Sequence, residues 1–250
     1  MDYIFVFILG LVIGSFLNVC IYRIPMNESI IFPASHCTSC KHSLHVLDLI
    51  PVMSYLMLKG RCRYCENRIS IRYPILELFN AILYLLIYYK FGIDILTLKY
   101  CMLVSLLIVI SIIDYNTQNV YSITILVGVV ISSLFILIQY ILYDQSSFNF
   151  ILGGIIGALI IGLVVFATKG MGEGDIEIAG ICGLFIGYKI IFLSLFIAII
   201  VGGIFAIGIL LLKVKEAKDK IAFGPFIAIG TIISIMYGSE LIEMYIKLLI

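Results

Sequence analysis

The sequence predicts an all-α polytopic membrane protein of about eight transmembrane helices, with a small cytoplasmic zinc-binding loop domain. The composition is the first reason: 63% of the 250 residues are hydrophobic and only 12% are charged, with a mean hydropathy of +1.20. A soluble core does not need so much apolar sequence. The long apolar runs and one cysteine-rich polar stretch are the other two reasons. The net charge of +1 gives no indication of a nucleic-acid partner.

Eight apolar runs have about the length that a membrane-spanning helix needs, roughly 17–25 residues, or fewer where protein buries the helix. They cover residues 3–22, 74–89, 98–113, 120–143, 150–168, 176–188, 190–212 and 222–246. Only Tyr188-Lys189 separates the sixth run from the seventh, so a tight turn or a single bent helix would fit there. The predicted parts are a first transmembrane helix (1–22), a zinc-binding domain (23–73) and a transmembrane helical core (74–250).

The distribution of basic residues predicts the orientation. With the N-terminus outside, 12 of the 16 Lys and Arg residues fall in the inside loops. These loops are 23–73, 114–119, 169–175 and 213–221. Eight spans then leave both termini outside and place residues 23–73 in the cytoplasm.

The cytoplasmic stretch carries two C-x₂-C pairs, Cys37/Cys40 and Cys62/Cys65. About 50 residues cannot bury much core, and four cysteines at this spacing are typical of a structural zinc site. Disulfides are disfavoured in a reducing cytoplasm, so zinc is preferred over redox chemistry or free thiols. The nearby histidines are expected to be solvated, because four thiolates already complete a tetrahedral site.

Two acids are predicted at the cytoplasmic ends of separate spans. Asp175 follows the glycine-rich segment 169–174 and begins the sixth run, and Asp114 ends the third. An acid at membrane depth is a functional-site hypothesis by default, although Asp175 also fits a helix N-cap. Two carboxyl groups that share a site can divide the roles of base and acid. Glu77 and Glu177 are expected to be interfacial residues.

Small residues within the spans are expected to serve helix packing. These are Gly14 and Ser15 in the first run, Gly153, Gly154, Gly157 and Gly162 in the fifth, and Gly202, Gly203 and Gly208 in the seventh. No internal repeat is visible in the sequence.

The order of motifs resembles that of bacterial type IV prepilin peptidases, and the resemblance covers nearly the whole chain. The motifs are Gly14-Ser15-Phe16-Leu17-Asn18-Val19 with Arg23 and Pro25, the two C-x₂-C pairs, Arg72-Tyr73-Pro74 with Glu77, Ile113-Asp114, Gly172-Glu173-Gly174-Asp175 and Phe223-Gly224-Pro225-Phe226. The G-x-G-D element is the signature of intramembrane aspartyl proteases. One departure is Asn119-Val120-Tyr121, where the family usually has an Ile-Pro pair.

The resemblance implies a bifunctional enzyme of the bacterial cytoplasmic (inner) membrane. It would cut the short leader of type IV prepilins or pseudopilins at the cytoplasmic face, and N-methylate the new N-terminal residue with S-adenosylmethionine. Asp114 and Asp175 would be catalytic, and Cys37, Cys40, Cys62 and Cys65 would bind zinc. The expected partners are prepilin or pseudopilin substrates and membrane lipid, with no nucleic acid. The sequence does not indicate an oligomeric state. The residues that bind the methyl donor are not indicated.

Two alternatives come from other activities. A peptidase without methyltransferase activity would share the same aspartates. A transporter with a proton-relay aspartate pair would also place acids in the membrane, but transport sites gather near the midplane. The predicted position of Asp114 and Asp175 at one membrane face therefore favours the protease.

Overall fold

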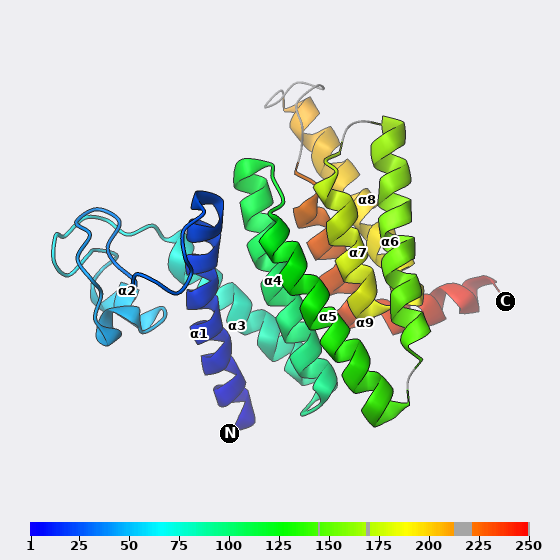
Figure 1. The fold of residues 1–250 in the computed structure, drawn as a ribbon, viewed down its shortest axis with the longest axis horizontal. Helices are drawn as coiled ribbons and strands as arrows, with labels where there is room; N and C mark the ends of the chain where they lie inside the picture. Colours follow the sequence, from blue (N-terminus) through cyan, green and yellow to red (C-terminus); the bar gives the residue numbers. More distant parts are fainter. Residues whose placement is uncertain (145, 169–170, 213–221, 250) are drawn as a thin grey trace. The chain divides into compact units, whose positions relative to one another are not determined.

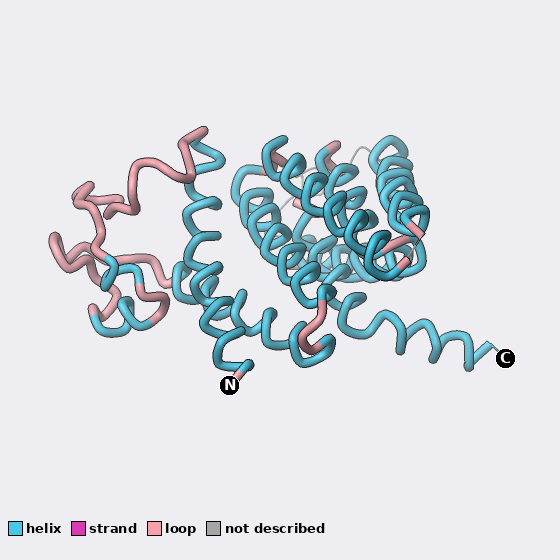
Figure 2. Tube along the Cα trace, turned by 60° about the horizontal axis from the view of Figure 1, so that its bottom comes forward, coloured by secondary structure: helices cyan, strands magenta, loops and turns pink. Residues whose placement is uncertain are grey.

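The structure, a computed structural model, describes residues 1–144, 146–168, 171–212 and 222–249. Part of the predicted glycine-rich segment, Lys169 and Gly170, lies outside these ranges. The lysines of the predicted inside loop 213–221 also lie outside them. The described residues form helices and loops without a named strand, as Figure 2 shows. The predicted all-α class is therefore confirmed.

Nine α-helices and two 3₁₀ helices follow one another in the described residues. In chain order they are α1 (Asp2–Arg23), η1 (Ile24–Met26), η2 (Val46–Leu49), α2 (Met53–Met57), α3 (Arg72–Phe91), α4 (Ile95–Thr117), α5 (Ser122–Tyr143), α6 (Ser147–Thr168), α7 (Gly174–Ile186), α8 (Tyr188–Leu211) and α9 (Gly224–Leu249). Every apolar run predicted from the sequence overlaps one helix, which is α7 for the sixth run and one of the long helices for each of the others.

Seven helices of the described chain are long and apolar enough to cross a membrane: α1, α3, α4, α5, α6, α8 and α9. The eighth predicted span corresponds to α7, which has 13 residues. At 1.5 Å per residue it is about 20 Å long, shorter than the roughly 30 Å hydrocarbon core of a bilayer. The count of spanning helices is thus close to the predicted eight.

The sixth and seventh apolar runs are two helices. The chain breaks at Gly187, whose φ of +79° lies in the left-handed region that favours glycine. A side chain there would also lie 2.9 Å from the amide of Asn149 on α6. The break therefore precedes the predicted Tyr188-Lys189 junction, and the single bent helix is excluded.

The chain divides into two compact units, Met1–Cys101 and Met102–Ile250. In unit 1, α1 packs along α3 in antiparallel fashion. A methyl group added at Gly14 would lie 2.8 Å from the Cα of Glu77, and the Asn80 amide donates to the Gly10 carbonyl at 2.8 Å. One helical turn further along α1, the Asn18 amide donates to the Tyr73 carbonyl at 3.2 Å. The predicted packing role of Gly14 is confirmed.

The polar part of unit 1, between α1 and α3, is attached to both of these helices. Arg23, at the end of α1, is 4% exposed. Its guanidinium donates to the carbonyls of Ser29 at 2.8 Å and Pro33 at 2.7 Å. On α3, the Glu77 carboxylate accepts the N–H of Val52 at 2.8 Å. Two buried charged side chains thus fix the course of an otherwise loop-rich segment.

In unit 2, glycines bring α6 and α7 together. A methyl group added at Gly153 would lie 2.5 Å from the Gly183 carbonyl oxygen, and one at Gly157 would lie equally close to the Ala179 carbonyl oxygen. The two helices lie side by side in Figure 1. The predicted packing face of the fifth run is thus confirmed at these positions.

The predicted packing glycines of the seventh run behave differently from one another. A methyl group added at Gly202 would lie 2.9 Å from the ring of Phe223, whereas one at Gly203 or Gly208 would have nothing within 4 Å. The packing role is confirmed for Gly202 and is wrong for the other two. Contact between α8 and α9 also includes a buried hydrogen bond between the hydroxyls of Ser194 and Thr231, at 2.9 Å.

Candidate active site and metal centre

Asp114 lies three residues before the end of α4 and is 5% exposed. Its Oδ2 accepts the N–H of Gly224, the first residue of α9, at 3.1 Å. The N–H groups of a helix's first turn have no partner within the helix and carry a partial positive charge. The start of α9 therefore supplies a fixed donor to the Asp114 carboxylate.

Asp175 is the second residue of α7 and is 4% exposed. Its Oδ2 accepts the N–H of Gly172 at 3.1 Å, and its own N–H donates to the Gly172 carbonyl, also at 3.1 Å. The N-cap position of α7 belongs to Glu173, which makes no side-chain cap. The reading of Asp175 as an N-cap is therefore wrong: its carboxylate closes the turn that precedes the helix.

Gly224 connects the surroundings of the two acids. A methyl group added there would lie 2.7 Å from Oδ2 of Asp114 and 3.1 Å from Cδ1 of Ile178. Ile178 follows Asp175 by three residues, which places both on one face of α7. The charge of Asp114 also acts on the Asp175 carboxyl. The described structure thus gathers the two predicted acids around the start of α9.

Three helix ends meet at this site. The end of α4 brings Asp114, the start of α7 brings Asp175, and the start of α9 brings Gly224. Figure 1 shows these ends at the same end of unit 2. The role of Gly224 as a donor was missed by the sequence analysis, although Gly-Pro at the start of an apolar run is typical of a helix N-terminus.

The four predicted metal ligands come together in unit 1. The Sγ atoms of Cys37, Cys40, Cys62 and Cys65 all lie within 4.8 Å of one another, and those of Cys37 and Cys65 are 3.9 Å apart. Zinc binds thiolates at about 2.3 Å, so a tetrahedral site needs sulfur atoms about 3.8 Å apart. The four thiols therefore fit a zinc ion.

Each C-x₂-C pair is held by the same backbone pattern, repeated 25 residues later. In the first turn the Cys37 N–H donates to the His42 carbonyl, and the Lys41 N–H donates back to the Cys37 carbonyl. In the second turn Cys62 pairs in the same way with Asn67 and Glu66. This internal repeat was not predicted from the sequence, although the equal spacing of the two cysteine pairs is its signal.

The backbone favours the thiolate form of Cys37, which is the form that a metal binds. The hydrogen bond from the Cys40 backbone N–H is the largest of the effects that together lower the pKa of Cys37 to about 6. A thiolate is the form of cysteine that binds metals. The ring centroids of His42 and Tyr64 lie 3.7 Å apart, and the four-cysteine group that the described residues form includes no histidine.

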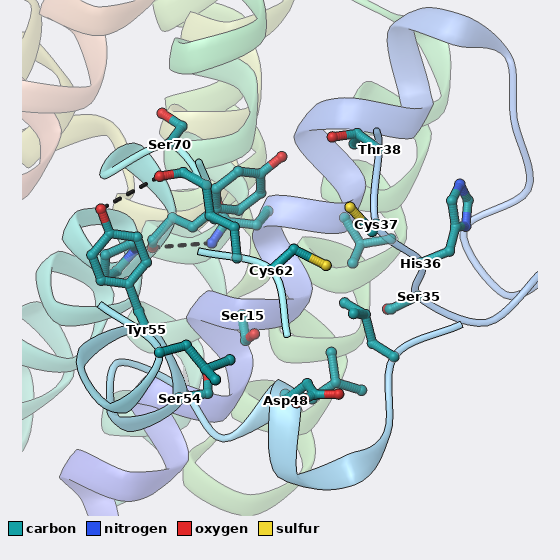
Figure 3. Close-up of a pocket in the computed structure, with 18 of the residues that line it drawn as sticks. Ser15, Ser35, His36, Cys37, Thr38, Asp48, Ser54, Tyr55, Cys62 and Ser70 are labelled. Carbon is teal, nitrogen blue, oxygen red and sulfur yellow. Dashed lines mark hydrogen bonds between the residues drawn. The ribbon is translucent and has the colours of Figure 1, made fainter. Parts of the chain in front are cut away.

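Unit 1 also holds a cavity of about 390 Å³. It is lined by Ser15, Asn18 and Tyr22 of α1, by Tyr73 and Glu77 of α3, and by residues of the segment 35–70. Figure 3 shows Ser15 among lining residues of that segment, including Cys37, Asp48, Tyr55 and Cys62. This space is the unit-1 cavity. It has the size of a small-molecule site, for which 300–1,000 Å³ is usual.

Comparisons with known proteins match both units. Residues 8–91 match the model of the bacterial peptidase A24 N-terminal domain, and residues 101–207 match that of the type IV leader peptidase family. A prepilin leader peptidase/N-methyltransferase of Bacillus subtilis is 31% identical over 97% of each chain. Proteins of the same name from Pseudomonas putida and Neisseria gonorrhoeae are 29% and 30% identical, over 97% and 89% of this chain and 93% and 86% of theirs. No solved structure matches.

Proposed function

Since the chain belongs to the type IV leader peptidase family, we propose that Asp114 and Asp175 are the catalytic pair with which it cleaves its substrate. The chain is a peptidase and an N-methyltransferase, which removes the leader peptide of type IV prepilins and N-methylates the new N-terminal residue. The observation that carries the proposal is the gathering of two buried carboxyl groups, from separate helices, around Gly224.

The hydrogen bonds of the pair leave one oxygen of each carboxyl group available. Asp114 and Asp175 each accept a backbone N–H at Oδ2. Their Oδ1 atoms accept no hydrogen bond from the residues that the structure describes. Each carboxyl group is thus oriented by the backbone through one oxygen, and we propose that the other oxygen contacts the attacking water or the substrate.

These free oxygens suit direct hydrolysis by water. One carboxylate takes a proton from the water as its oxygen bonds to the scissile carbonyl carbon, and the other, protonated, carboxyl group donates its proton to the carbonyl oxygen. When the C–N bond then breaks, the proton held by the first carboxyl group passes to the leaving amine. No acyl-enzyme forms, so no serine or cysteine nucleophile is required.

The methyl donor and the metal complete the proposal. S-adenosylmethionine supplies an electrophilic methyl group to the new amine, and the unit-1 cavity has the size for it. Zinc held by the four cysteines supports a loop segment that has little core of its own, since domains of this size often need a metal. Thiolates fill all four positions of the tetrahedron, which leaves no open position and makes the zinc structural.

We place the catalytic pair at the cytoplasmic face of the bacterial inner membrane. The placement follows from the basic loops, because 12 of the 16 Lys and Arg residues fall on the side of Asp114 and Asp175 when the predicted orientation is used. Positions at helix ends also argue against the transporter alternative, since transport sites gather at the midplane. The names of the relatives do not favour a peptidase without methyltransferase activity.

The test uses purified protein in detergent with a prepilin and S-adenosylmethionine. Mass spectrometry of the product is expected to show loss of the leader and, on the new N-terminus, one added methyl group. A cleaved but unmethylated product would contradict the methyltransferase activity alone. An uncut prepilin, with a homologous peptidase cutting the same sample, would contradict the peptidase activity.

A further inference from the structure

Glu77 is a buried acid that the proposed cleavage step does not use. It lies on α3, lines the unit-1 cavity and is 7% exposed. Its carboxylate accepts the Val52 N–H at 2.8 Å, and Ser15 lines the same cavity. No Lys or Arg of the described chain forms an ion pair with it. Its hydrogen bonds are therefore made by neutral groups, and its charge is not balanced by the protein.

The arginines that line the cavity either have partners other than Glu77 or are exposed. Arg23 donates to backbone carbonyls, and Arg63 pairs with Asp48 at 2.6 Å. Arg68 also lines the cavity but is exposed. Burying a carboxylate is costly unless an opposite charge accompanies it. Glu77 is thus the buried carboxylate of the cavity wall that has no ion-pair partner among the described residues, and its local negative charge suits a cationic ligand.

We propose that the unit-1 cavity binds a cationic reactant of the methyl transfer and that Glu77 is its counter-ion. The proposal rests on the methyltransferase activity described above. Both reactants have this chemistry: the methyl donor is a sulfonium cation, and the new N-terminus is an α-ammonium at neutral pH. The cavity offers what either would need, a carboxylate together with hydroxyl and amide groups such as those of Ser15 and Asn18.

The reaction itself explains why a carboxylate belongs there. The ammonium must lose a proton before its nitrogen can attack, and Glu77 can accept that proton and pass it to water. The new N–CH₃ bond then forms as the S–CH₃ bond breaks, and the bonding electron pair stays on sulfur. The positive charge moves from sulfur to nitrogen, and Glu77 stabilises it on either atom by charge–charge attraction.

Binding, measured by calorimetry in detergent, tests the proposal without requiring turnover. Two ligand pairs differ in charge: S-adenosylmethionine against S-adenosylhomocysteine, and a short peptide beginning with phenylalanine against its N-acetylated form. The unmodified protein is expected to prefer the cationic member of at least one pair. In Glu77→Gln that preference is expected to fall at least about tenfold, because a charge-assisted contact contributes more than a neutral one. Affinity for the neutral member should stay unchanged.

Glu28→Gln is the matched control, because Glu28 is an exposed acid of the same unit that does not line the cavity. An unchanged charge preference in Glu77→Gln would overturn the proposal. The proposal would also be overturned if the unmodified protein bound the cationic and neutral members of both ligand pairs equally well. The pair that responds identifies whether the sulfonium or the ammonium faces Glu77.

A second measurement does not depend on the folding of a variant. A photoreactive analogue of S-adenosylmethionine, or of the peptide, is expected to label the unmodified protein within residues 15–77. Labelling confined to residues 102–250 would overturn the proposal. Cleavage and methylation of a prepilin are measured in the same preparation. If both activities are present but the cavity is not labelled, the proposal for Glu77 fails while the proposed function stands.

Discussion

At the scale of single residues, the absence of a side chain at position 224 allows α9 to begin against the Asp114 carboxylate. The N–H of Gly224 donates to Asp114, and a methyl group there would lie 2.7 Å from the same oxygen. That methyl group would also lie 3.1 Å from Cδ1 of Ile178, a fully buried side chain, so it would crowd both neighbours. One glycine therefore fixes the position of an oxygen on which the proposed hydrolysis depends.

Gly224→Ala is expected to reduce the rate of leader cleavage about 100-fold, because a shift of about 1 Å in a catalytic group costs that much. Gly203→Ala is the matched control, since a methyl group there would have nothing within 4 Å and alanine stabilises a helix interior relative to glycine. Initial rates with a prepilin peptide would be compared. Equal rates in the two variants would contradict the role given to Gly224.

At the scale of elements, the segment between α1 and α3 has little regular structure and depends on its attachments. Two short turns present the four cysteines, and Arg23 and Glu77 fix the segment to the helices. The helices of this unit need no metal, because α1 and α3 pack directly along Gly10 and Gly14. Loss of zinc is thus expected to disturb the loop segment and leave the helix pair in place.

Cys62→Ser is expected to abolish the binding of about one zinc ion per chain and to reduce methylation more than cleavage. The reason is that Cys62 belongs to the four-cysteine cluster of the loop segment, whereas Asp114 and Asp175 belong to unit 2. Cys101→Ala, a buried cysteine outside the cluster, is the control and should keep the metal. Elemental analysis and product mass spectrometry provide the measurements. Full zinc content in Cys62→Ser, or an equal loss of both activities, would refute the prediction.

At the scale of the whole molecule, the two chemical steps are assigned to different compact units. The proposed catalytic aspartates belong to residues 102–250, whereas the four-cysteine cluster and the unit-1 cavity belong to residues 1–101. A substrate that has been cut already should therefore be methylated without the aspartates. The two activities can be separated by the choice of substrate as well as by mutation.

Hydropathy predicts the helices of this chain well because each span is a long local pattern. The positions of Asp114 and Asp175 at the ends of such spans also follow from local sequence. Contacts between distant segments do not: the Gly224 N–H reaches Asp114 across 110 positions, and Val52 meets Glu77 only when the loop folds back on α3. The short α7 was predicted as a span because its residues are apolar. Hydropathy does not reveal that the helix ends at Gly187.

The most direct test measures both reactions in Asp114→Asn, in Asp175→Asn and in the double variant, with intact prepilin and with a pre-cut peptide. Asparagine keeps the shape of aspartate and removes the ionisable group. Each single change is expected to abolish cleavage, and the double change to be no worse, because the two carboxyl groups act as one unit. Methylation of the pre-cut peptide should persist in all three, showing that the protein is folded. Cleavage at a near-normal rate in either single variant would contradict the account.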